Sequence, residues 1–260
     1  MNQDRVISLA GVHNFRDYGG YAVAGGGRLK RGLLWRSGDH SGAEPDDLAT
    51  IDRLGLASVF DLRTAHERSR YPSRRPTGFA AREHLADSAG TAPAPHLAAA
   101  HANGVRSIEA AREGMRQAYL SIPFRAELVA ILRTYLAGLA QGDGPSLVNC
   151  MAGKDRTGWA VALVHTIAGV HHDDMMEDYL LTNTAGDPEA RIASRLAEIR
   201  AMSGERDEAV LRVFLSVEAS YLETALAEVA ARHGSMDGYL KTVLGCDAAM
   251  RDALRQALCE

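Results

Sequence analysis

A cysteine and an arginine stand six residues apart in the stretch SLVNCMAGKDRTGW, residues 146–159. The apolar run before Cys150 predicts a strand, and the apolar run TGWAVALVHTIAG (157–169) predicts a helix that begins directly after Arg156. A helix N-terminus presents unpaired backbone N–H groups and the positive end of a dipole. A strand, a tight loop and a helix in this order are therefore typical of an anion site.

The residue types in the loop suit covalent phosphate chemistry. Five residues between Cys150 and Arg156 let successive backbone N–H groups converge on one centre, and Gly153 can take a positive φ without a Cβ clash. The planar guanidinium of Arg156 matches two phosphate oxygens. Cys150 is then expected to lie beneath the phosphorus as a thiolate nucleophile, stabilised by the same N–H groups. Thr157 is expected to donate a hydrogen bond from its hydroxyl to the sulfur, and so to help the sulfur leave phosphorus in the second step of the reaction.

Two other interpretations of the loop fit less well. A nucleotide-binding loop needs G-x-x-x-x-G-K-[ST], but Val148 occupies the place of the first glycine and Asp155 follows Lys154. A buried cysteine with an unrelated arginine six residues later would explain the bare spacing alone. The strand before it, the helix after it, the glycine and the Arg-Thr-Gly sequence together favour the phosphate loop.

Composition limits the other classes of function. A chain of 260 residues with 46% hydrophobic content can bury a large core, so residues 1–260 are expected to form a single domain. A net charge of −4 argues against nucleic-acid binding by a broad basic surface. The N-terminus lacks the pattern of a leader, and no apolar run approaches the ~20 residues of a membrane span, so a cytoplasmic protein without stable membrane insertion is expected.

The sequence gives no indication of a metal or of disulfides. Cys150, Cys246 and Cys259 are far apart and form no C-x-x-C pair, so all three are expected to be free thiols. The run HHDD (171–174) follows a glycine and precedes MMEDYLL, which is typical of a solvated helix start with acidic residues at the positive dipole end. We therefore expect no metal site and no cofactor.

The remaining patterns predict an α/β fold. Strands are expected within 32–37, 56–63 and 146–150, with a short helix in EPDDLATIDRLG between the first two. The pattern weakens over 67–114, which we interpret as a long excursion or lid. Helical periodicity returns in SIEAAREGMRQAYL and FRAELVAILRTYLAGLA, and the C-terminal region 171–260 is expected to be nearly all helical.

Several motifs resemble one known family. The loop CMAGKDRTG is similar to the signature C-x-x-G-K-D-R-T-G of a bacterial tyrosine phosphatase family. HNFRDYGGY (13–21), LWRSGDHS (34–41), VFDLRTAHE (59–67), MEDYLLTN and GSMDGYLKTVLG also resemble stretches of that family, so the similarity spans the chain. The resemblance implies the Cys-dependent phosphatase fold: a central, mainly parallel sheet flanked by helices, with a helical lid and no metal.

The resemblance also implies roles for the site residues. Cys150 is expected to form a phosphocysteine intermediate, and Arg156 to stabilise the phosphoryl charge. Lys154 is expected to add a positive charge at the rim, as in lipid phosphatases that accept inositol phosphates. Asp155 is the favoured general acid and Asp61 the second candidate. The residues expected to bind the phosphate are Met151, Ala152, Gly153, Lys154, Asp155, Arg156 and Thr157.

The implied function is dual-specificity hydrolysis of phosphomonoesters in proteins, mainly phosphotyrosine and also phosphoserine or phosphothreonine. A phosphoinositide is the alternative substrate, and a phosphorylated protein or a phosphoinositide is therefore the expected partner. The family usually has histidine before the cysteine, where this chain has Asn149. Because of this departure, a phosphate-binding module that has lost catalytic turnover remains an alternative function. Arg16 and Asp17 either line the pocket or form an ion pair at the glycine-rich turn that follows them.

Overall fold

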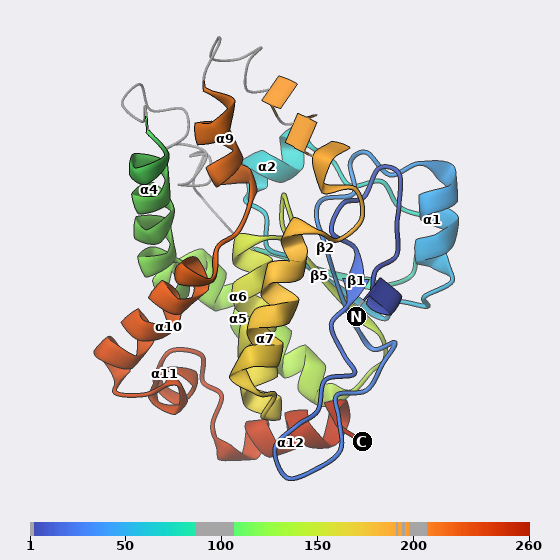
Figure 1. Cartoon of the computed structure of the whole chain (residues 1–260). Helices are drawn as coiled ribbons and strands as arrows, with labels where there is room; N and C mark the ends of the chain where they lie inside the picture. Colours follow the sequence, from blue (N-terminus) through green and yellow to red (C-terminus); the bar gives the residue numbers. More distant parts are fainter. Residues whose placement is uncertain (1–2, 87–106, 191, 194–195, 198–206) are drawn as a thin grey trace.

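The computed structural model describes residues 3–86, 107–190, 192–193, 196–197 and 207–260 (Figure 1). A five-stranded sheet has the order β1-β2-β5-β3-β4. β1 runs antiparallel to β2, and the other neighbouring strands are parallel. The strands are β1 (Arg16–Asp17), β2 (Leu34–Ser37), β3 (Ser58–Asp61), β4 (Arg82–Leu85) and β5 (Ser146–Asn149). This central, mainly parallel sheet with flanking helices confirms the predicted α/β fold class.

Helices make up most of the remaining described chain. The predicted helix between the first two strands is α1, and the helix after the cysteine loop is α6. The α-helices are α1 (Pro45–Asp52), α2 (Ala65–Arg70), α4 (Ile108–Ser121), α5 (Ala126–Gln141), α6 (Asp155–Ala168), α7 (His172–Leu180), α9 (Glu208–Leu215), α10 (Ala219–His233), α11 (Met236–Thr242) and α12 (Ala248–Leu258). Short 3-10 helices cover Gln3–Arg5, Ile122–Phe124 and Leu181–Asn183.

Side chains alternate between the two faces of the sheet, and each face packs in a separate apolar cluster. Leu34, Phe60 and Val148 belong to the large cluster that also contains the buried residues of α4, α5, α6, α10 and α12. Trp35, Val59 and Leu147 point the other way and pack with Ile51 of α1 and with residues near the N-terminus. Figure 1 shows α1 by itself on one side and the larger group of helices on the other. The sheet is therefore covered on both faces, as parallel sheets require.

The register of the parallel strands brings three chain segments together. Asn149, the last residue of β5, pairs with Ser37 at the end of β2 and with Asp61 at the end of β3. The segments that follow these three strands therefore meet at one edge of the sheet. This carboxyl edge is where open parallel sheets bind their ligands, and it is the edge at which Cys150 lies.

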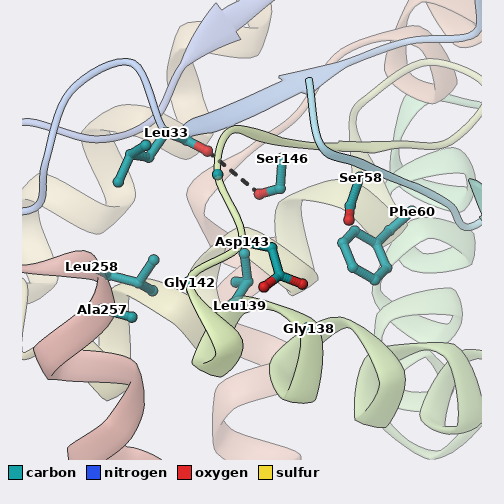
Figure 2. A pocket seen from close by; sticks show the side chains of 11 residues that line it. Leu33, Ser58, Phe60, Gly138, Leu139, Gly142, Asp143, Ser146, Ala257 and Leu258 are labelled. Carbon is teal, nitrogen blue, oxygen red and sulfur yellow. Dashed lines mark hydrogen bonds between the residues drawn. The ribbon is translucent and has the colours of Figure 1, made fainter. Parts of the chain in front are cut away.

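A small cavity lies at the opposite, amino-terminal edge (Figure 2). Its volume is about 30 Å³, which leaves room for about one water. Ser58 and Ser146, the first residues of β3 and β5, line it together with residues around the C-terminus of α5. The Ser146 hydroxyl donates to the Leu33 carbonyl at 3.4 Å. The cavity is thus separated from Cys150 by the length of β5.

The segment 67–114, interpreted from the sequence as a long excursion or lid, contains a strand. Strand β4 lies within it and pairs in parallel with β3. Its sequence REHL contains one apolar residue, and its outer position leaves three of its four residues exposed, so the usual alternation of apolar residues is missing. Residues 87–106, the middle of the expected lid, lie outside the described residues, so the lid stays a prediction. None of the described helices is long and apolar enough to cross a membrane.

Candidate active site

The cysteine loop connects β5 to α6 as the sequence predicts. β5 ends at Asn149, Cys150 follows it directly, and α6 begins at Asp155. Cys150 is 3% exposed and Arg156 is 6% exposed, so both side chains lie in the interior of the carboxyl edge. The first turn of α6 therefore carries Arg156, and the N-terminus of the helix faces the loop.

The carbonyl groups of the loop point outward, where other segments bind them. The Asp39 N–H donates to the Met151 carbonyl at 3.0 Å. The Asn14 side-chain amide donates to the Gly153 carbonyl at 2.7 Å and lies 3.4 Å from the Ala152 carbonyl. The peptides are trans, so each following N–H points in the opposite direction. The loop N–H groups are thereby directed to the inside of the loop, as phosphate binding requires.

Two glycines allow close contacts around this loop. Gly153 has a φ of 62°, and a Cβ there would lie 2.4 Å from the backbone of Ser37. Gly158, in the Arg-Thr-Gly sequence, lets α6 approach the ring of Tyr179 in α7, because a Cβ would lie 3.0 Å from ring carbons. A side chain at either position would displace the loop or the helix that follows it.

Arg156 is held by a buried carboxylate. Its Nη1 and Nη2 donate to the two carboxylate oxygens of Glu67 at 2.7 and 2.8 Å, and Nη1 also donates to the Leu62 carbonyl at 3.0 Å. Burial lowers the pKa of Arg156, but the charge and the hydrogen bonds of Glu67, with smaller contributions from other groups, together raise that pKa, so the guanidinium stays charged. Glu67 is placed by the first turn of α2, where it forms a capping box with Thr64. The motif VFDLRTAHE includes Glu67, but nothing in it indicates that Glu67 pairs with Arg156.

Lys154 does not lie at the rim, where it was expected. Its side chain is 1% exposed, and its Nζ donates to the carbonyls of Phe214 at 2.6 Å and Ser216 at 3.0 Å. These carbonyls lie at the C-terminus of α9, where a cation interacts favourably with the helix dipole. The lysine thus links the cysteine loop to α9.

Asp155 also faces the interior. The Tyr119 hydroxyl donates to Asp155 Oδ1 at 2.7 Å, and the hydroxyls of Tyr119 and Tyr179 are 2.7 Å apart. Lys154 Nζ lies 3.5 Å from the same carboxylate oxygen. Burial, and then the charge of Asp155, raises the pKa of Tyr119 well above its ordinary value, so this phenol keeps its proton and acts as a donor. Tyr119, on α4, is a contact of the loop that local sequence patterns do not reveal.

Asp61 lies at the same edge of the sheet, as expected, but it is engaged by Arg63. The Arg63 guanidinium contacts both carboxylate oxygens of Asp61, with Nη2 2.6 Å from Oδ2 and Nε 2.9 Å from Oδ1. Asn149 contributes a longer contact, from its Nδ2 to Asp61 Oδ1 at 3.4 Å. Asn149 thus points to Asp61 rather than to the backbone of the loop.

Two further expectations concern Thr157 and the Arg16-Asp17 pair. The Thr157 hydroxyl is buried and makes no hydrogen bond with the described protein atoms, so its bond to sulfur stays a prediction. Arg16 does not pair with Asp17 but with Asp178, at 3.1 Å. Asp17 accepts from the N–H groups of Gly19 at 2.7 Å and Gly32 at 2.8 Å, and so stabilises the turn.

Comparison with known proteins identifies the family. A model of the tyrosine phosphatase family matches residues 7–260. The chain belongs to the tyrosine phosphatase family. A putative tyrosine-protein phosphatase of Cupriavidus necator is 33% identical over 248 residues, which cover 92% of this chain and 84% of that protein. The triple specificity protein phosphatase PtpB of Mycobacterium tuberculosis is 33% identical over 264 residues, covering 91% of this chain and 93% of that protein. Protein phosphatase activity follows from this membership and confirms the predicted class of enzyme.

The bidentate contact between Glu67 and Arg156 generates a first prediction. Glu67→Gln retains one acceptor oxygen but loses the second one and the negative charge, so the guanidinium is no longer fixed in one plane. We expect kcat/KM for an aryl phosphate to fall by about 100-fold, the size of effect that a small misplacement of a catalytic group produces. Glu113→Gln on α4, an exposed carboxylate paired with Arg116, is the matched control and should retain activity. Equal kcat/KM values for the two variants would contradict a role of Glu67 in orienting Arg156.

Proposed function

We propose that this phosphatase hydrolyses phosphotyrosine in proteins through a phosphocysteine intermediate on Cys150. The single observation that carries the proposal is the orientation of the loop: its carbonyls are bound from outside by Asp39 and Asn14, which directs its N–H groups inward. Arg156 lies at the end of the same loop with its guanidinium fixed by Glu67. This combination suits a group with three equatorial oxygens and spread negative charge.

In the first step, the Cys150 sulfur attacks phosphorus in line with the ester oxygen. The S–P bond forms while the P–O bond to the tyrosyl oxygen breaks, and the electron pair of that bond stays on the leaving oxygen. Asp155 donates a proton to this oxygen, so that a neutral phenol leaves. The loop N–H groups and Arg156 bind the phosphoryl oxygens throughout.

In the second step, a water molecule attacks the phosphorus of the phosphocysteine. Asp155, now ionised, accepts a proton from the water as the P–O bond forms. The S–P bond breaks, and its electron pair returns to sulfur as a thiolate. A hydrogen bond from Thr157 would stabilise that developing charge, and inorganic phosphate then leaves.

The geometry supports Asp155 over Asp61 as the proton donor. Arg63 binds both carboxylate oxygens of Asp61 and so occupies the atoms that would carry the proton. Asp155 is adjacent to Arg156, and the Tyr119 hydroxyl donates to only one of its carboxylate oxygens, Oδ1. Lys154 Nζ lies 3.5 Å from the same oxygen, but this ammonium also donates to two backbone carbonyls.

This assignment predicts how the reaction depends on pH and on the leaving group. A general acid acts only while protonated, so turnover declines as pH rises, and Asp155→Asn should remove that decline. The variant should be impaired far more on phenyl phosphate than on a nitrophenyl ester, whose leaving oxygen scarcely needs a proton. Rates for both esters across the pH range measure this. If Asp61→Asn shows the leaving-group dependence and Asp155→Asn does not, the general acid is Asp61.

We further propose that the enzyme accepts phosphoserine and phosphothreonine besides phosphotyrosine, in keeping with the name of the triple specificity relative. A phosphoinositide carries further anionic groups that need a second cation near the loop. Lys154 was the residue expected to supply it, but it is bound to the carbonyls of Phe214 and Ser216. This contact favours a protein over a phosphoinositide as the substrate.

A comparison of two substrates tests this preference. We expect a phosphotyrosine peptide to be hydrolysed with a kcat/KM at least about tenfold above that of a short-chain phosphoinositide, since one missing ionic contact is worth on the order of 1.4 kcal/mol. Lys154→Met should then affect both substrates in the same proportion. A larger loss for the phosphoinositide in Lys154→Met would show that the lysine turns to the substrate.

The rival function is a phosphate-binding module without turnover, which the Asn149 departure keeps open. Release of phosphate from an aryl phosphate distinguishes the two, and Cys150→Ser should abolish that release because the hydroxyl is a far weaker nucleophile than a thiolate. Binding of vanadate without any Cys150-dependent phosphate release from the unmodified protein would support the module.

A further inference from the structure

Four buried side chains from three distant segments form a polar network behind the catalytic loop. Arg16 and Arg36, neighbours on β1 and β2, both contact the Asp178 carboxylate of α7, at 3.1 and 2.5 Å. Arg16 also donates to the side chain of Asn14. The two arginines and Asp178 have 0% exposure, and Asn14 has 3%. Arg16, Arg36 and Asp178 take no part in the proposed reaction steps.

The network reaches the loop at one atom. The carbonyl of Gly153 accepts from Arg36 Nη2 at 2.8 Å and from Asn14 Nδ2 at 2.7 Å. Two donors on one carbonyl occupy both of its lone pairs. The Gly153 peptide can therefore not rotate without leaving a buried guanidinium and a buried amide without their acceptor, which is costly. The N–H group of the same peptide bond belongs to Lys154, and it is thereby held toward the inside of the loop.

The network also carries an excess of positive charge. Burial, and then the neighbouring Arg36, lowers the pKa of Arg16 to about 10, so it remains a cation at neutral pH. Burial raises the pKa of Asp178, but the charges of Arg16 and Arg36 outweigh this and hold that pKa well below its usual range. Two cations and one anion leave a net charge of +1, buried directly behind the loop that binds the phosphate.

We propose that Arg36 is a positioning residue of the phosphatase, which fixes the Gly153 peptide so that the loop N–H groups face the substrate phosphate. It acts through the loop rather than on the substrate, and the inference rests on the proposed phosphocysteine reaction. Asn14 shares the same acceptor and supports the same orientation.

The choice of variant follows from the charges. Asp178→Asn would leave two buried cations without an anion, and breaking a buried ionic group in this way is strongly destabilising. Arg36→Met removes the contact with Gly153 and leaves Arg16 and Asp178 as a neutral pair, so the fold should persist. Arg16→Met is the matched control: it also leaves one neutral pair and removes a donor to the Asn14 side chain, but the direct contact of Arg36 with Gly153 remains.

In the full-length protein, we expect Arg36→Met to raise both the KM for an aryl phosphate and the inhibition constant of vanadate by about tenfold or more, since one lost oxyanion donor is worth on the order of 100-fold and Asn14 retains part of the orientation. Asn14→Gly keeps the positive φ of 59° at that position and should change the same constants in the same direction. Partial unfolding would reduce kcat per total protein and leave both constants unchanged, because the molecules that remain folded bind normally.

The outcomes are separable. A larger rise of both constants in Arg36→Met than in Arg16→Met supports the positioning role. Unchanged constants in Arg36→Met, or equal changes in both variants, overturn it, since equal changes would mean that the direct contact of Arg36 with Gly153 adds nothing to the effect of losing either arginine. If the proposed function itself is wrong, the unmodified protein will show no phosphate release that depends on Cys150. This result is distinct from any difference between the two variants.

Discussion

The outward direction of the loop carbonyls is the constraint on which the rest of the site depends. A loop that binds an anion with its N–H groups must turn its carbonyls to the protein, and each buried carbonyl then needs a donor. Here the donors come from Asp39, just after β2, and from Asn14, close to the N-terminus. The Gly38 N–H in turn donates to the His13 carbonyl at 2.8 Å. The N-terminal segment, the end of β2 and the cysteine loop therefore form one interlocked unit, and the chain before β1 is part of the site.

The buried ion pairs of this site fix the orientation of side chains more than they stabilise the fold. Arg156 with Glu67, and Arg63 with Asp61, are buried pairs at the carboxyl edge of the sheet. Desolvation cancels much of the attraction in such pairs, so they contribute little to the free energy of unfolding compared with apolar packing. What they do provide is a fixed direction for each guanidinium, because a bidentate contact is planar. The position of α2 thereby determines, through Glu67, the direction of the Arg156 guanidinium.

The sequence predicts those features that local rules govern. The strand before Cys150, the helix after it and the positive φ of Gly153 follow from apolar runs and from the absence of a Cβ over a few residues. Partners across the fold do not follow from such rules. Glu67 is 89 residues from Arg156 in sequence, and Asp178 is 142 residues from Arg36. Their pairing depends on the order of the strands and on the packing of α7. Lys154 shows the same limit, since the motif placed it in the loop but only the packing of α9 turns it inward.

The described buried charges at this edge do not cancel completely. Arg156 and Glu67 cancel each other, as do Arg63 with Asp61 and Lys154 with its neighbour in the loop, 3.5 Å away. Among these described groups, the remaining uncompensated charge is the +1 of the two arginines that share Asp178. A phosphate bound inside the loop would compensate this charge. The charges of the whole edge, in addition to the helix dipole of α6, therefore favour an anion at the loop.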